Sequence, residues 1–405
     1  MESTDVTLRK STKYVSRKIT KFFISINKIL VLYGLPIIWT HDFTLSKNSD
    51  RVSGLYRTLS NILIIVFVAM EWGAFYTQNN LTEKQSSDRL MFCVTHPILV
   101  VYILNIEYYE KKIKVIMYKM MVTLKQSHND VEVEKKLFKK CMFYSVTFFT
   151  SVALSVFFYG FDAYIQAHSG STFTKTISAW PDVEDRSLAA DVVRVVNYVI
   201  LVILLTRVSG VYVLVVLLTI CISHQYTNIN TYFLSLSKIF NENLTQIEKE
   251  KKYERALIIG IDLHSQTMWC KRQCQSMFNV VFSFQIILNV MLLVLLMLQM
   301  TSSERTLMNA IPVVSTGVSL LCSTGFFMWN AGDITVEASS VATALYCSGW
   351  ENCHVSTLRI RYLLLMTIRQ GQKPEMLKAL GLIPLSYDTY VSIVKASYSI
   401  FSVIY

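Results

Sequence analysis

The residue types that most often catalyse reactions or hold metals occur in this chain without the spacing that such sites need. The seven histidines are scattered along the sequence. Cys270 and Cys274 have no second pair of ligands, and Cys347, Cys353 and His354 lack the tight, repeated spacing of a zinc site. No glycine-rich phosphate loop and no nucleophile elbow is found. The sequence therefore predicts neither an enzyme nor a metal or cofactor site.

The last predicted helix carries its polar side chains on one face. Asp388, Ser392, Lys395, Ser399 and Ser402 are spaced by four, three, four and three residues. At 100° per residue they fall within an arc of about 80°. A polar stripe on a membrane helix either packs against other helices or lines water, and several copies around an axis would line a pore. Both interpretations fit the sequence, and the stripe favours the pore.

Arg207 lies near the middle of a long apolar segment. An arginine at the centre of a membrane helix costs roughly 2.5–3.5 kcal/mol on insertion scales, so it should face the protein interior and find an acidic partner. Glu71 and Asp162 are the candidates. A structural ion pair and a functional one fit the sequence equally well.

Membrane-spanning helices would have to position these residues. The 405 residues are 52% hydrophobic and only 17% charged, whereas soluble domains carry about 25% charged residues. A helix crosses a bilayer with about 20 apolar residues. The segments of that length are 59–78, 90–109, 142–165, 192–222, 277–300, 307–329 and 384–405. Residues 22–39, interrupted by Gly34 and Pro36, are predicted to form an interfacial or re-entrant helix instead.

The basic residues indicate how these helices are oriented. Most of the 39 lysines and arginines lie before the first span and in the second-to-third, fourth-to-fifth and sixth-to-seventh connections. Cytoplasmic segments are enriched in Lys and Arg. We therefore predict an all-α polytopic membrane protein with seven transmembrane helices, a cytoplasmic N-terminus and an extracellular C-terminus.

Two classes of partner are disfavoured by the same pattern. The net charge of +11 comes from blocks of basic residues between the spans. These blocks indicate the topology of the chain and membrane lipids as its partners, and they do not predict a nucleic-acid partner. A G-protein-coupled receptor would have the opposite orientation, and its Asp-Arg-Tyr and Asn-Pro-x-x-Tyr motifs are missing. The predicted orientation puts the "NLT" at Asn80 in an outer loop as a glycosylation acceptor, and the match at Asn243 inside.

The carboxyl-terminal stretch, residues 331–405, resembles the insect odorant receptor family. The matching elements are Gly332, the "ALY" at 344–346 with Trp350, the "RQGQKP" turn at 369–374, and "KALGLIPLSYDTYVSIVKASYSIFSV" at 378–403. Seven spans, inverted topology and about 400 residues extend the resemblance to the whole chain.

This resemblance implies one subunit of an odorant-gated, non-selective cation channel in the plasma membrane that needs no G protein. Members of the family assemble as heterotetramers with a shared co-receptor. The connection between spans four and five lacks the co-receptor's long insertion, so the chain resembles an odorant-specific tuning subunit.

The resemblance also divides the chain by function. It implies a cytoplasmic tail with an interfacial or re-entrant helix (1–58), a six-helix ligand-binding bundle with cytoplasmic helical extensions (59–330), a cytoplasmic anchor segment (331–383) and a pore-lining seventh helix (384–405). Val403 matches the family's hydrophobic gate, and Ser399 and Ser402 would face the pore nearby.

An odorant site in the outer half of the bundle, for a small volatile hydrophobic ligand, is the remaining implication. Aromatic and Met side chains suit such a ligand, held by shape and by one hydroxyl bond. The positions of this chain that would form the site are Met91, Phe92 and Thr95 on the second span, Phe157, Gly160, Phe161 and Tyr164 on the third, Tyr198 and Val202 on the fourth, Met297 on the fifth, and Met308 and Ile311 on the sixth.

Two other functions are alternatives for a chain with these spans. A gustatory-receptor-like ligand-gated cation channel is the main alternative, although such chains usually end in a "TY…QF" pattern that is missing from "SYSIFSVIY". A transporter would show an internal repeat between its halves, and the seven unequal spans show none.

Overall fold

Helices account for most of the structure. The computed structural model describes residues 17–39, 46–168, 170, 172–174, 176–302, 307–355, 357–373 and 375–404. In these residues the one sheet is a two-residue antiparallel pair, β1 (Lys378–Ala379) with β2 (Ile383–Pro384). The predicted all-α fold class is therefore confirmed.

Each predicted span coincides with a helix, and most of these helices extend well beyond it. The seven are α2 (Lys47–Thr77), α3 (Glu83–Tyr108), α6 (Val131–His168), α7 (Leu188–Ser235), α8 (Gln246–Ser302), α9 (Leu307–Tyr346) and α11 (Tyr387–Ile404). Among the described residues, α2, α3, α6, α7 and α8 are long and apolar enough to cross a membrane by length and composition.

Shorter elements connect them at the end of the bundle that we expect to be cytoplasmic. After α3 come α4 (Glu110–Tyr118), the π-helix η2 (Lys119–Thr123) and α5 (Leu124–Ser127). The 3-10 turn η3 (Leu236–Asn241) joins α7 to α8, and η4 (Trp350–Asn352) with α10 (Thr357–Gly371) follows α9.

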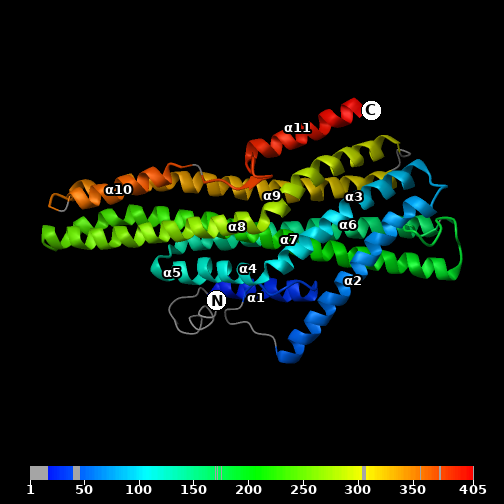
Figure 1. The fold of residues 1–405 in the computed structure, drawn as a ribbon, viewed down its shortest axis with the longest axis horizontal. Coiled ribbons are helices and arrows are strands. Elements are labelled where there is room, and N and C mark those ends of the chain that lie inside the picture. Colours follow the sequence, from blue (N-terminus) through cyan, green and yellow to red (C-terminus); the bar gives the residue numbers. More distant parts are fainter. Residues whose placement is uncertain are drawn as a thin grey trace.

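The long helices run along one axis of an elongated molecule (Figure 1). α7, α8 and α9 extend to one end, where α10 lies against α9, while the loops joining α2 to α3 and α6 to α7 lie at the other end (Figure 1). α11 contacts α8 and α9, and its last turns rise away from the bundle at the top of the view (Figure 1).

α7 is the central helix of this bundle. Nearly every residue from Arg207 to Asn230 is buried, on all faces of the helix. A helix that is apolar all round is expected to be enclosed by other helices, and α7 contacts α2, α3, α6, α8 and α9. It therefore connects the membrane part of the molecule to the helical extensions.

The segment before α2 folds back on itself. α1 (Arg17–Leu32) has 16 residues, about 24 Å of helix, which is shorter than the roughly 30 Å hydrocarbon core. Gly34 follows in the left-handed region, with φ +69°. The returning chain is fixed by Asn27, whose Oδ1 accepts from the amides of Ile38 (3.1 Å) and Trp39 (3.2 Å).

Candidate ligand-binding site

A cavity of about 160 Å³ lies between five helices of the bundle. It is lined by Met91, Phe92, Thr95, His96 and Leu99 of α3; Phe148, Val152, Ser155, Val156 and Tyr159 of α6; Tyr198, Leu201, Val202, Leu205, Val208, Ser209 and Tyr212 of α7; Leu288 and Leu292 of α8; and Thr316, Ser319, Leu320 and Ser323 of α9. Aliphatic and aromatic side chains make most of this wall.

Helical spacing places each set of lining residues on one stripe. On α6 the lining residues recur at intervals of four, three, one and three, and on α7 at three, one, three, three, one and three. These intervals keep side chains on one face of a helix. The cavity is thus formed where one stripe from each of α3, α6 and α7 meets short stretches of α8 and α9.

Part of the predicted odorant site lies on this wall. Met91, Phe92, Thr95, Tyr198 and Val202 all line the cavity. Gly160 lies beside it, since a Cβ atom there would collide with the hydroxyl of Tyr198. That an odorant contacts these residues stays a prediction.

The other predicted positions do not line the cavity. Phe157, Phe161 and Tyr164 are 60%, 46% and 63% exposed. Phe157 lies two residues from the lining Ser155 and Tyr159, which is about 200° around the helix. Met297 is partly buried and Ile311 is 40% exposed, and neither is part of the wall. The side chain of Met308 lies outside the described residues.

Most of the wall consists of residues that were not predicted from the sequence. Leu99, Leu201 and Leu205 extend the stripes that begin at Thr95 and Tyr198, so helical spacing alone could have found them. No sequence pattern indicated that Ser155 and Ser319 line a cavity, because serine in a membrane helix is as common in helix-helix contacts as in cavity walls.

Most hydroxyl groups on the wall already donate hydrogen bonds. The Oη atom of Tyr198 donates to the carbonyl of Val156 at 2.9 Å, and the Oγ atoms of Ser155 and Ser319 are 2.7 Å apart. Tyr212 donates to Oε1 of Gln285 at 2.5 Å, and Nε2 of Gln285 donates to Thr324 at 2.8 Å. These bonds join α6 to α7 and to α9 around the cavity, and they fix the shape of its wall.

One member of a buried titratable pair, His96, also belongs to the wall. His96 and Glu71 are 2% and 1% exposed, and Nδ1 of His96 lies 2.9 Å and 2.8 Å from the two carboxylate oxygens of Glu71. The imidazole stacks on the ring of Phe92, with centroids 4.9 Å apart. The cavity is therefore bordered by one buried histidine whose ring orientation is fixed.

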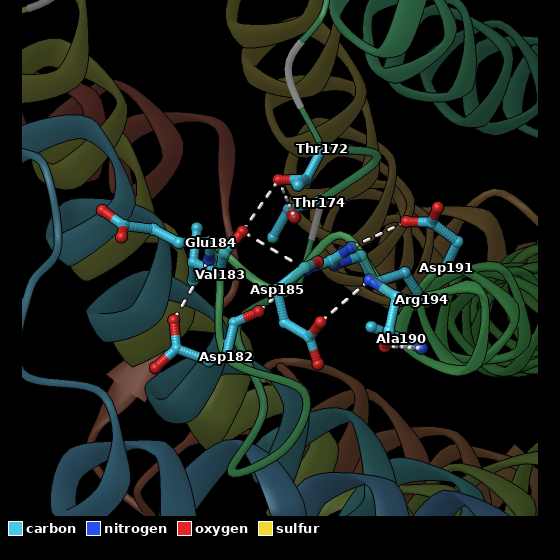
Figure 2. A network of polar contacts seen from close by, with 10 residues as sticks. Thr172, Thr174, Asp182, Val183, Glu184, Asp185, Ala190, Asp191 and Arg194 are labelled. Atoms are coloured by element: carbon cyan, nitrogen blue, oxygen red, sulfur yellow. Dashed lines mark hydrogen bonds and ion pairs between the residues drawn. The ribbon is translucent and has the colours of Figure 1, made fainter.

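The loop between α6 and α7 is held against the same end of the bundle. Arg194 donates to the carbonyls of Asp182 (2.8 Å), Val183 (3.3 Å) and Asp185 (2.5 Å), and it pairs with Asp191 at 2.7 Å. Figure 2 shows this network around the guanidinium group. The arginine is thus the main connection between α7 and this loop.

Two further contacts connect the loop to α2 and to the cavity. Gln78, the residue directly after α2, donates to the carbonyls of Ser178 (3.2 Å) and Pro181 (3.1 Å). Phe173 meets the ring of Tyr198 edge to face, with centroids 5.7 Å apart. Because Tyr198 lines the cavity, the loop touches the back of the cavity wall.

Arg207 is fully buried and pairs with an acid that we did not expect. Its Nη2 atom lies 2.8 Å from Oε1 of Glu107 and donates to the carbonyl of Gly34 at 3.2 Å. The expected pairing with Glu71 or Asp162 is therefore wrong. Glu71 is level with His96, which lies eleven residues, or about 16 Å of helix, from Glu107 along α3.

The polar stripe of α11 faces away from the chain's own bundle. Ser399, Ser402 and Val403 are exposed, as are Asp388, Ser392 and Lys395, while Ile393 and Ser397 on the opposite side are buried. Tyr390 packs its ring against Trp329 of α9, with centroids 5.7 Å apart. Packing of the stripe inside the bundle of its own chain is thereby excluded.

Two other predicted features can be located. Asn80 is exposed in the loop between α2 and α3. Cys270 and Cys274 are buried along α8, and among the described residues no group of three His, Cys, Asp or Glu could hold a metal ion.

Comparisons with known proteins agree with this architecture. The model of the 7tm odorant receptor family matches residues 84–398. No curated protein matches the sequence. The solved structure of the olfactory receptor OR5 from the insect Machilis hrabei in complex with eugenol is similar with a TM-score of 0.81 and 12% identity, covering 96% of this chain and 99% of that one. The same receptor solved alone has a TM-score of 0.78 at 12% identity, covering 95% and 98%.

Proposed function

Because this chain belongs to the 7tm odorant receptor family, we propose that it is the odorant-binding subunit of a ligand-gated, non-selective cation channel in the plasma membrane. Its N-terminus is cytoplasmic, and its partner is the shared odorant co-receptor in a heterotetramer. This proposal keeps the odorant-specific tuning role that the sequence predicts.

The cavity between α3, α6, α7, α8 and α9 is the observation that carries the proposal. Its volume is about 160 Å³, and an apolar protein cavity of about 150 Å³ is large enough to bind benzene. An aliphatic and aromatic wall with few polar groups is typical of small-molecule sites. The ligand is therefore a small, volatile, hydrophobic odorant, and the solved relative in complex with eugenol is compatible with such a ligand.

The pore is built from α11 of several subunits. The stripe that includes Ser399 and Ser402 is exposed in a single chain, and copies of it around an axis enclose water. Val403, 86% exposed, forms the hydrophobic constriction, since apolar rings gate by excluding water. In this assembly residues 59–330 bind the ligand, 331–383 anchor the subunits and 384–405 line the pore.

α9 provides the physical connection between the cavity and the pore helix. Leu320 and Ser323 line the cavity. The carbonyl of Leu321, between them, accepts a hydrogen bond from Tyr390 of α11 at 3.4 Å. A ligand opens the channel only if it binds the open state more tightly than the closed one. An odorant that shifts this turn of α9 shifts the support of α11 directly.

The test is to record currents in cells that express the chain with and without an odorant co-receptor, against a panel of volatile compounds. Val152→Phe fills the cavity from α6, and we expect it to raise the effective odorant concentration at least about tenfold. Val146→Phe adds the same ring to the same helix at a position that is 55% exposed, and it should respond like the wild type. No current with any partner or compound would contradict the channel proposal.

A further inference from the structure

We propose that His96 supplies a hydrogen-bond donor to the cavity and so selects odorants that carry an acceptor oxygen, such as ketones, aldehydes and esters. The inference rests on the proposed function, because the odorant would occupy the same cavity. It adds the chemical class of ligand, which shape alone does not specify.

The orientation of the His96 ring is fixed from two sides. Its Nδ1 edge points to Glu71 of α2, at 2.9 Å and 2.8 Å from the carboxylate oxygens. Its faces meet the rings of Phe92 (4.9 Å) and Phe67 (5.9 Å). Nε2 is on the opposite edge of the imidazole from Nδ1, so it points away from α2, and His96 is part of the cavity wall. Within the described residues no hydrogen bond involves Nε2.

The net charge of the Glu71–His96 pair determines whether Nε2 carries a hydrogen atom or a lone pair. Both side chains are almost fully buried, and an unbalanced charge is costly in such a place. Among the described residues Glu71 makes no ion pair except with His96. Arg89, about two turns earlier on α3, donates to the carbonyls of Ala74 and Gln78 instead. We therefore take the pair as neutral as a whole, with one proton shared between Nδ1 and the carboxylate.

A neutral pair exists in two forms. In the first, an imidazolium donates Nδ1–H to an ionised Glu71, and Nε2 carries the second proton. In the second, a protonated Glu71 donates to a bare Nδ1, and the one proton of the neutral imidazole is on Nε2. Nε2 is a donor in both forms, wherever the shared proton lies. Nε2 of His96 therefore presents an N–H group to the cavity and not a lone pair.

Six of the hydroxyl groups on the wall compete poorly for this role; Thr95, Tyr159 and Thr316, which also line the cavity, are not among them. Those whose hydroxyl hydrogens already go to protein acceptors are Tyr198, Ser209, Tyr212 and Ser323, and Ser155 and Ser319 are bonded to each other. A hydrocarbon in the cavity would leave Nε2–H without a partner away from water. A site built to form a hydrogen bond rejects an analogue that lacks the matching atom.

The experiment compares isosteric pairs in which C=O is replaced by C=CH₂: acetophenone with α-methylstyrene, and cyclohexanone with methylenecyclohexane. Binding is measured as stabilisation of the purified full-length chain against heat, and gating as current in cells. For the wild type we expect half-maximal stabilisation at a ketone concentration about tenfold or more below that of the matched alkene. The double variant Glu71→Met with His96→Phe replaces the pair by apolar side chains and should lose this difference. Leu205→Val, a purely apolar change in the wall, should move both members of each pair together.

The outcomes separate this inference from the proposed function. Ketone-selective stabilisation without any current would leave the His96 assignment standing and reject the channel. Equal stabilisation by ketone and alkene in the wild type, no stabilisation by either, or a preference that survives the double variant would each overturn the assignment. If the double variant does not fold, His96→Asn replaces it. Its amide nitrogen takes the place of Nδ1 and still donates to Glu71, while no donor remains at the position of Nε2, so loss of the ketone preference is again the expected result.

Discussion

Glu71 and Glu107 each hold a basic partner inside the helix bundle, and the two pairs have different consequences. The Glu71–His96 pair borders the cavity, where its remaining proton can face a ligand. The Glu107–Arg207 pair joins α3 to α7, and through the carbonyl of Gly34 it reaches the turn after α1. We expect the first pair to affect ligand recognition and the second pair to stabilise the packing of the helices.

At the residue scale we predict that Arg207→Met strongly destabilises the protein. The change leaves Glu107 without its buried partner, and breaking such a pair costs about 3–5 kcal/mol. We expect a large drop in the melting temperature of the purified receptor and low surface expression.

Arg57→Met is the matched control for this prediction. Arg57 also pairs with a glutamate, Glu110, at 3.1 Å, but its side chain is 32% exposed. An exposed pair of this kind contributes at most about 1 kcal/mol. Equal losses of stability in the two variants would show that burial of the Arg207 pair is not what matters.

The sequence predicted burial and pairing of Arg207 but not its partner, and it placed only part of the cavity wall. The free-energy cost of burying Arg207 in a membrane depends only on the position of Arg207 along its helix, so the sequence reveals it. Which acidic residue pairs with Arg207 depends on which residues of neighbouring helices lie at the same depth, and the sequence does not reveal this. On α6 three of the four predicted positions, Phe157, Phe161 and Tyr164, lie on the exposed face. A membrane helix is apolar both toward lipid and toward a ligand cavity, so hydrophobic periodicity does not separate the two faces.

At the element scale, α11 stands out because it has two different faces. The face with Ile393 and Ser397 packs against its own bundle, and the stripe with Ser399 and Ser402 does not. The amphipathic spacing read from the sequence was enough to predict this division. The seven apolar segments were also predictable as helices, since twenty consecutive apolar residues have few other stable arrangements, whereas most of the helices extend beyond these segments.

We predict that Val403→Ala changes the gating or permeation of the channel. A smaller side chain widens and weakens the hydrophobic constriction, so current in the absence of odorant should rise or ion selectivity should shift. Ile400→Ala removes apolar volume from the flank of the same helix and should leave both properties as they are. Unchanged currents for Val403→Ala would remove this residue from the pore and leave the family assignment intact.

The loop between α6 and α7 offers a second prediction for an element. Arg194→Leu removes the donors that hold the carbonyls of Asp182, Val183 and Asp185. Losing one well-formed hydrogen bond costs about 1 kcal/mol, so backbone amides in residues 176–187 should exchange with solvent several-fold faster or more. Odorant sensitivity should also fall, because the loop supports Tyr198 through Phe173.

Asp191→Asn is the control for the loop. It weakens only the ion pair of Arg194 with a half-exposed carboxylate and keeps the bonds to the carbonyls. Exchange rates that rise equally in both variants would mean that the ion pair, and not the carbonyl contacts, fixes the loop.

At the scale of the whole molecule, the proposed orientation puts the α2–α3 loop outside the cell and the α7–α8 connection inside. Asn80 and Asn243 each begin an acceptor sequence, and both are exposed. We predict that Asn80→Gln abolishes a glycosidase-sensitive shift in electrophoretic mobility and that Asn243→Gln leaves it unchanged. A glycan on Asn243 would reverse the orientation of the chain.

The length of α7 has a mechanical consequence. Its 48 residues extend for about 72 Å, more than twice the roughly 30 Å hydrocarbon core. Val202 lines the cavity, and Asn228 on the same unbroken helix accepts from the amide of Asp130 at 3.0 Å, about 39 Å further along. Because α7 is enclosed by other helices, we expect it to move along its axis as one body. A ligand-induced shift at Val202 would then also displace Asn228 and its contact with Asp130.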